Sequence, residues 1–299
     1  MKTRNGGVVM DASAPSSWFV VPALVLFLAF AIIPLVIALG LSFTSWNGLT
    51  DPVFNGVSNW VRELGDPLTY HALWLTLQVI VVSWVIQTPM SILVGVFVSG
   101  KQRYRALLAA LYFLPLILSS AAIAIAYKAL LDPNYGVGHA FDIPALARDW
   151  LGNPATALYV VIFVIAWQFI PFHSLLYQAG ARQIPASLYE ASEIDGAGRV
   201  RQFFSITLPQ LKNTVITSST LMIVGSLTYF DIVYVLTQGG PGYATRILPL
   251  DMYLTGFSAS DLGGASVLAV ILVVIGLVIA LALTRFSGFN RMTSEQEGA

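Results

Sequence analysis

The sequence contains no cysteine and very little charge. Without cysteine the chain has no disulfide, no thiolate nucleophile and no thiolate-ligated zinc site. Only 10% of the 299 residues are charged, compared with about 25% in a typical soluble domain. The 15 basic residues balance the 15 acidic ones, which excludes the basic excess of a typical nucleic-acid-binding protein. The hydrophobic fraction of 57% excludes a disordered chain and favours a membrane protein over a soluble enzyme.

Long uncharged stretches are the main positive feature of the sequence. A helix that crosses a bilayer needs about 20 apolar residues, because hydrocarbon offers no partner for an unpaired backbone group. The stretches predict an all-α polytopic membrane protein with six transmembrane helices, at Trp18–Phe43, Ala72–Val98, Ala106–Leu130, Ala155–Gln178, Thr214–Leu236 and Leu262–Thr284. Prolines inside four of these helices predict bends, at Pro34, Pro89, Pro115 and Pro171.

The basic residues are distributed unevenly between the two sides of a six-helix arrangement. Eleven of the fifteen fall in the termini and in the second and fourth loops, namely Lys2, Arg4, Lys101, Arg103, Arg105, Arg182, Arg199, Arg201, Lys212, Arg285 and Arg291. Lys and Arg are enriched in cytoplasmic loops. We therefore expect both the N-terminus and the C-terminus to be cytoplasmic.

Catalytic and cofactor motifs are absent from the sequence. The stretch from Gly95 to Gln102 has the spacing of a P-loop, but Gln102 replaces the Ser or Thr that would bind magnesium. Its glycines lie in a predicted membrane helix, so we interpret the match as coincidence. His71, His139 and His173 lack metal-ligand spacing, and packing is the favoured interpretation of His173. We expect a non-catalytic chain that binds no metal or cofactor, with any ATP hydrolysed by another subunit.

The predicted cytoplasmic loop 181–212 is longer than a connector between two spans requires. Pro185 suits a helix start, and Ser187 followed by Glu190 has the spacing of a capping box. Gly196 can end this helix, and a second short helix over 199–205 is expected to follow. The loop is either a capped surface connector or a docking helix whose small residues let a partner approach closely.

Motifs in this loop resemble those of a known family. Glu190-Ala191-Ser192, Asp195-Gly196-Ala197 and Ile206-Thr207-Leu208-Pro209 are similar to the "EAA" loop of ABC importer permeases, in the version of the carbohydrate-importing branch. The resemblance covers nearly the whole chain, through Ser42–Trp46, Leu114-Pro115, Asp132–Gly136, and Leu236–Pro241 with Thr245. It implies one transmembrane permease domain over residues 1–299. The chain departs mildly at Ser192, where a second Ala is usual, and at Asn213, where a Pro often stands.

The resemblance implies a set of partners and a coupling site. The partners are a second homologous permease, two ATPase subunits that use ATP and magnesium, an extracytoplasmic solute-binding protein and a carbohydrate substrate, in a bacterial or archaeal inner membrane. The residues expected to couple the chain to an ATPase are Glu190, Ala191, Ser192, Asp195, Gly196, Ala197, Phe203, Phe204, Leu208 and Pro209.

The same resemblance selects candidate residues for the substrate pathway, which are Ser120, Gln168, Phe172, Gly225, Ser226, Tyr229 and Asp231. Asp231 is the only acid inside a predicted span, and intramembrane acids are functional candidates. On a regular helix, at about 100° per residue, Asp231 points away from the face of Ser226 and Tyr229. Asp231 therefore either lines the pathway or reaches the outer surface and Lys128. Ser120 and Gln168 either contact substrate or join two helices by hydrogen bonds.

Two other functions remain open at this point. The first is an ABC permease for a glycerol phosphodiester or another non-sugar solute. The second is a self-sufficient secondary transporter, a class that often shows inverted repeats and charged midplane residues. The sequence offers one intramembrane acid and no obvious repeat.

Overall fold

The structure, a computed structural model, describes residues 17–100 and 103–286 and is almost entirely helical. Within these residues, two short antiparallel strands pair Thr44 with Phe54, β1 (Thr44–Ser45) and β2 (Val53–Phe54). Four helices are long and apolar enough to cross a membrane, and a bent pair raises the count to five. A mostly helical polytopic membrane protein is thereby confirmed, whereas the predicted count of six is not reached by continuous helices.

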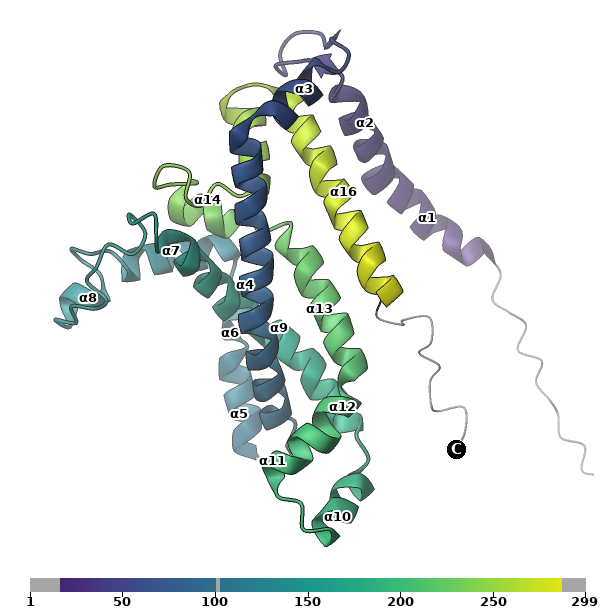
Figure 1. The fold of residues 1–299 in the computed structure, drawn as a ribbon, viewed down its shortest axis with the longest axis vertical. Coiled ribbons are helices and arrows are strands. Elements are labelled where there is room, and N and C mark those ends of the chain that lie inside the picture. The colour runs from purple at the N-terminus through teal and green to yellow at the C-terminus, as the bar shows by residue number, and fades with distance from the viewer. Residues whose placement is uncertain (1–16, 101–102, 287–299) are drawn as a thin grey trace, which may run out of the picture.

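The first predicted span is one peripheral helix from Trp18 to Leu41. It consists of η1 (Ser17–Val20), α1 (Val21–Phe27), η2 (Leu28–Ile32) and α2 (Ile33–Leu41). The π-helical turn η2 ends two residues before Pro34, which cannot donate to the carbonyl four residues earlier. Neither α1 nor α2 contains a buried residue, and Figure 1 shows both at the edge of the molecule.

The centre of the bundle is the seam between α4 (Pro67–Val98) and α9 (Ala157–Gln183), which pack along much of their lengths. Val79, Val161 and Ile165 form its core and are completely buried. Gly95 lies where the two backbones approach, since a Cβ there would sit 2.6 Å from the Ser174 carbonyl oxygen. This glycine of the P-loop-like stretch therefore serves helix packing. Lys101 and Gln102 lie outside the described residues.

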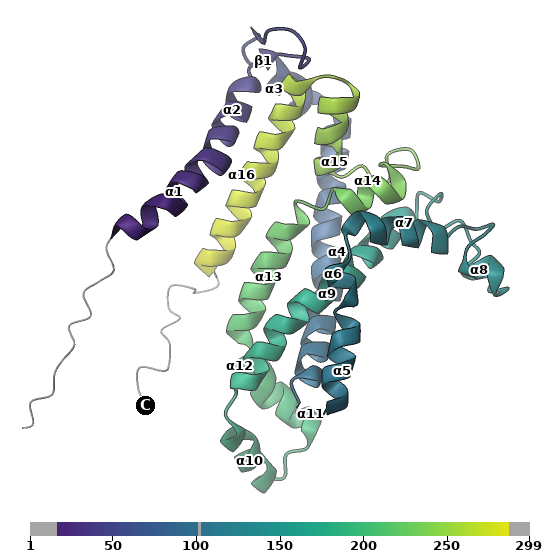
Figure 2. The same ribbon diagram turned by 180° about the vertical axis from the view of Figure 1, so that it is seen from behind.

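The third predicted span, Ala106–Leu130, is not one continuous helix. The segment forms α5 (Arg103–Tyr112), α6 (Leu114–Ile117) and α7 (Ser120–Leu130). Pro115 occupies the first turn of α6, and Leu118 is extended, with ψ 147°. Ser119 then caps α7 by accepting a hydrogen bond from the Ala122 N–H at 3.2 Å. As a result α7 runs across the direction of α5 (Figures 1 and 2).

The fifth predicted span, Thr214–Leu236, is also broken. It forms α13 (Lys212–Ser226) and α14 (Asp231–Thr237), which meet at 49°. The break at 227–230 lets α14 leave the line of α13 and pack against α7. The two broken spans therefore meet in the middle of the structure, as Figure 2 shows.

One end of the molecule carries α3 (Ser58–Gly65) and the start of α16 (Leu262–Phe286), and α15 (Leu248–Tyr253) with η4 (Leu254–Ser258) leads to this end. The short helix α8 (Val137–Ala140) lies to the side, beyond α7 (Figure 1). Asn59 donates to the carbonyls of Ser42 and Thr44 at 3.0 and 2.8 Å. Arg62 pairs with Glu63 and with Asp261 at the start of α16. Burial raises the pKa of the Glu63 carboxyl, and the Arg62 guanidinium opposes that rise. These contacts tie the first helix, α3 and α16 together.

The opposite end carries the segment 181–212 as α10 (Ala186–Ile194), α11 (Arg199–Gln202), η3 (Phe203–Thr207) and α12 (Leu208–Gln210). The predicted short helix is confirmed, and Gly196, at φ +74°, follows its end. The predicted capping box is wrong. Pro185 is the N-cap and Ser187 lies inside the first turn, where its side chain makes no capping hydrogen bond.

Candidate functional site

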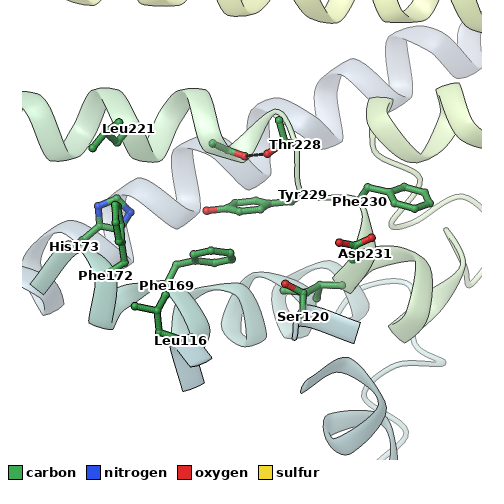
Figure 3. A pocket seen from close by; sticks show the side chains of 12 residues that line it. Leu116, Ser120, Phe169, Phe172, His173, Leu221, Thr228, Tyr229, Phe230 and Asp231 are labelled. Atoms are coloured by element: carbon green, nitrogen blue, oxygen red, sulfur yellow. Dashed lines mark hydrogen bonds between the residues drawn. The ribbon is translucent and has the colours of Figure 1, made fainter. Parts of the chain in front are cut away.

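A cavity of about 420 Å³ lies where the two broken spans meet (Figure 3). This volume is within the range of ligand pockets, about 300–1,000 Å³. Five elements, α6, α7, α9, α13 and α14, together with the break at 227–230, supply its walls. The lining residues are Leu116, Ser120, Phe169, Phe172, His173, Leu221, Gly225, Thr228, Tyr229, Phe230, Asp231 and Ile232.

Five of the seven candidate pathway residues line this cavity, namely Ser120, Phe172, Gly225, Tyr229 and Asp231. The other two, Gln168 and Ser226, are buried beside it. The expectation that Asp231 points away from the face of Tyr229 is wrong, because it assumed a regular helix. The chain is not helical from 227 to 230, and the break brings both side chains to one cavity (Figure 3).

Gln168 positions Ser120 at the cavity wall. The Gln168 amide nitrogen donates to the Ser120 hydroxyl oxygen at 3.1 Å and to the Leu118 carbonyl at 3.4 Å. The helix–helix hydrogen bond expected as an alternative is therefore present, and Ser120 lines the cavity as well. Because the Ser120 oxygen accepts from Gln168, its own O–H can donate into the cavity.

Aromatic rings form one side of the cavity. Phe169 and Tyr229 face each other with ring centroids 5.2 Å apart at 31°. Ser226 and Gln87 flank the Tyr229 hydroxyl, and the Ser226 hydroxyl donates to the Met222 carbonyl at 2.8 Å. The Tyr229 ring is thus held in place between α9 and α13.

Asp231 is the first residue of α14 and its side chain is exposed. A carboxylate is favoured there by the dipole of the helix N-terminus. The ion pairs found in residues 17–100 and 103–286 join Arg62 to Glu63 and Asp261, and Arg246 to Asp251. The alternative pair between Asp231 and Lys128 is not formed there.

Sequence reasoning missed several lining residues. Phe169, Phe172 and His173 have the i, i+3, i+4 spacing that places residues on one helix face, so that spacing could have added Phe169 and His173. The packing interpretation of His173 is consistent with its burial and with its Nδ1, which lies 2.9 Å from the Ser218 hydroxyl. Thr228 and Phe230 lie in the break, where no helical spacing points to them.

The lining of the cavity has one carboxylate and neither Lys nor Arg. In the described part of the chain no three His, Asp or Glu side chains are arranged to hold a metal ion. What the lining offers is hydroxyl groups, one carboxylate and ring faces. This set can hydrogen-bond and stack on an uncharged polyhydroxyl solute.

The second candidate site is the exposed segment from α10 to α12. No residue of α10 is buried, and Glu190, Ala191, Asp195 and Gly196 are exposed. Ser192 and Ala197 are half-buried, as is Leu208, while Pro209 is exposed.

The paired phenylalanines that follow α10 differ in their surroundings. Phe203 packs with Leu208 against the buried cluster of Ile92, Tyr177 and Leu211. Phe204, whose ring meets that of Phe203 edge-on at 5.1 Å, is 61% exposed. Of the two rings, only that of Phe204 is available to a partner.

Comparison with known proteins assigns the chain to a family. Residues 87–288 match the family described as binding-protein-dependent transport system inner membrane component. The chain is 34% identical over 275 residues to the probable ABC transporter permease protein YurN of Bacillus subtilis, covering 90% of this chain and 94% of YurN. It is 30% identical to the multiple sugar-binding transport system permease protein MsmF of Streptococcus mutans, covering 89% of this chain and 92% of MsmF.

A solved structure shares the fold. A chain of the bacterial alginate ABC transporter, in complex with its alginate pentasaccharide-bound periplasmic protein, superposes with a TM-score of 0.79 at 22% identity, over 92% of this chain and 94% of that chain. The family implies a solute-binding protein and an ATPase as partners. The chain belongs to the binding-protein-dependent transport system inner membrane components, the non-catalytic, multi-pass permease subunits of prokaryotic ABC transporters.

Proposed function

We propose that residues 1–299 form one transmembrane domain that imports an uncharged carbohydrate, a sugar or an oligosaccharide. The observation that carries this proposal is the cavity lined by aromatic rings, hydroxyl groups and one carboxylate, with no Lys or Arg. Ser120 donates to a sugar oxygen, Asp231 accepts from sugar hydroxyls, and Phe172 with Tyr229 offers ring faces. The sugar-transport name of MsmF supports the same substrate class.

The cavity chemistry disfavours the non-sugar alternative. A phosphodiester carries a negative charge, which proteins bind with Arg, Lys or clustered N–H donors. The only charged group on the cavity wall is Asp231, which would repel such an anion. Membership of the ABC permease family argues against a self-sufficient secondary transporter.

The chain supplies half of the pathway, and a second homologous permease supplies the other half. Two ATPase subunits bind ATP and magnesium, and the α10 helix docks in a groove on one of them. The absence of any buried residue in α10 supports this role. The residues that face or position the ATPase contact are Glu190, Ala191, Ser192, Asp195, Gly196, Ala197, Phe203, Phe204, Leu208 and Pro209.

Six spans with both termini in the cytoplasm complete the proposal. The third span is the broken run α5–α7, and the fifth is the bent pair α13–α14. Elements that carry many of the described basic residues, α5, α11 and the start of α13, gather with α10 at one end (Figure 1). The absence of cysteine permits a direct test with single cysteines at two positions that are each 88% exposed, Tyr135→Cys and Ile194→Cys. A membrane-impermeant maleimide added outside intact cells should label only the cysteine at 135, and labelling of 194 would contradict this orientation.

Transport is tested in proteoliposomes that contain this chain, its partner permease, the ATPase and the matching binding protein. The panel is radiolabelled maltose, lactose, raffinose and the anionic phosphodiester glycerophosphoglycerol, each with and without ATP inside. We expect ATP-dependent uptake of at least one sugar and none of the phosphodiester. Uptake of glycerophosphoglycerol alone would overturn the substrate assignment. Glu190→Arg should abolish ATPase association, and intact association in that variant would overturn the docking role of α10.

A further inference from the structure

No residue of the helix α10 is buried, and side-chain hydrogen bonds connect the helix to the elements that follow it. The Ser192 hydroxyl donates to the Tyr189 carbonyl at 2.8 Å and accepts from the Gln202 amide nitrogen at 3.0 Å. The Tyr189 hydroxyl lies 2.8 Å from the Thr207 hydroxyl oxygen. These contacts link α10 to α11 and η3 at two points along its length.

The linked elements are anchored in the membrane bundle. Gln202 and Thr207 are both buried, although the helix that they hold is not. Phe203, which lies between them, packs against the cluster of Tyr177 and Leu211. A continuous set of contacts therefore leads from the exposed α10 to α9 and to the start of α13.

Burial makes the Gln202 contact costly to lose. A buried amide N–H without a partner loses its hydrogen bond to water and gains nothing in return. The Ser192 hydroxyl supplies that partner across the turn at Gly196. The family resemblance places Ala at this position, so the hydroxyl is a feature of this chain.

We propose that Ser192 and Gln202 are positioning residues that fix the orientation of α10 on α11, so that movement of an ATPase is transmitted to the bundle. The proposal rests on the proposed function of α10 as the ATPase-coupling helix. With two hinge-like connections, at Pro185 and at Gly196, α10 alone would rotate under load. The hydrogen bond between Ser192 and Gln202 spans the connection at Gly196 and restricts its rotation. The contact between Tyr189 and Thr207 restrains the middle of α10.

The test uses the complete transporter in proteoliposomes and measures sugar imported per ATP hydrolysed, with the sugar of the panel above that is imported fastest. With the ATPase present at a saturating concentration, Ser192→Ala should lower this ratio about two- to tenfold. Ser192→Thr keeps the hydroxyl and should restore the ratio. Ser187→Ala is the matched control, because Ser187 lies exposed on the same helix and its side chain makes no hydrogen bond within the described residues.

A double variant and a sugar-independent readout complete the design. The double variant Ser192→Ala with Gln202→Leu should lower the sugar-to-ATP ratio no further than the more affected single variant does, because both substitutions remove the same hydrogen bond. Spin labels on cysteines at Ser187 and Lys212 should give a narrow distance distribution that Ser192→Ala broadens. The proposal would be overturned if Ser192→Ala changed neither the distance distribution nor the sugar-to-ATP ratio. It would also be overturned if the losses in the double variant multiplied, or if Ser192→Thr had a ratio as low as that of Ser192→Ala. If every α10 variant, including Glu190→Arg, still associated with the ATPase, the docking role itself would be refuted instead.

Discussion

The cavity and the α10–α12 segment are built in opposite ways. The cavity forms where helices stop, between α6 and α7 and between α13 and α14. The α10–α12 segment stays helical through most of its length and is fastened by side-chain hydrogen bonds. Irregular backbone at membrane depth is tolerated only where protein or a water-filled cavity surrounds it. If the proposed roles are correct, the comparison teaches that substrate binding uses the breaks in the helices, whereas transmission uses their continuity.

One helix joins the two regions. Leu211, immediately before α13, is buried in the cluster that holds Phe203. Ser226, at the other end of α13, lies beside the Tyr229 hydroxyl at the cavity. Figure 2 shows α13 running from the α10–α12 segment to the level of the cavity, so in the proposed mechanism a displacement of that segment would reach the cavity wall through this one helix.

The largest effect is expected from a change that removes the support of both regions. Gly95→Val would place a side chain against the Ser174 carbonyl and the Tyr177 Cβ, where only a backbone hydrogen fits. Overpacking costs about 1–3 kcal/mol, occasionally more, and here the obstacle is backbone. We expect little folded transporter, measured by size-exclusion chromatography of the detergent-solubilised complex. Gly40→Val is the control, because a Cβ at Gly40 meets nothing within 4 Å. Equal yields from the two variants would mean that the seam is not a common support.

The next effect should fall on the cavity alone. Asp231→Asn keeps the size of the side chain and removes its charge. A hydrogen bond to a charged group is worth about 1.5–3 kcal/mol, so sugar uptake at low concentration should fall about 10- to 100-fold. Assembly and ATPase association should stay normal, measured by co-purification. Loss of assembly together with uptake would contradict the separation of the two regions.

A smaller effect should fall on the α10–α12 segment alone. Phe204→Ala removes an exposed ring, and we expect ATPase affinity to fall about tenfold with the fold intact, as for a moderate interface residue. Phe203→Ala is the comparison, because it empties a partly buried site in the bundle and should lower the unfolding midpoint of the complex instead. Titration of the ATPase and thermal unfolding monitor the two outcomes. A loss of ATPase affinity in Phe203→Ala together with a lower unfolding midpoint in Phe204→Ala would contradict these roles of the two rings.

The sequence predicted the local structure of the α10–α12 segment better than the geometry of the cavity. Pro185 and Gly196 act through their own backbone preferences, so the ends of α10 follow from single residues. The break at 227–230 contains neither Pro nor Gly, and the packing of α14 against α7 decides it. A regular helix was the reasonable expectation there, and on such a helix Asp231 points away from the face of Tyr229. Pro115 was visible as a bend, but the extended Leu118 that completes the break was not.

The smallest effect is expected at Lys128, and it tests how Asp231 works. If Asp231 acted on transport by pairing with this lysine, Lys128→Ala would reproduce the loss seen in Asp231→Asn, and the double variant would be no worse than either single one. Lys128 is exposed in the last turn of α7, and its charge suits the C-terminal end of that helix. Such a contact is worth about 0.3–1 kcal/mol, so uptake should stay within about twofold of the unmodified transporter. A tenfold loss in Lys128→Ala would move Asp231 from substrate binding to an ion pair that holds the cavity wall in place.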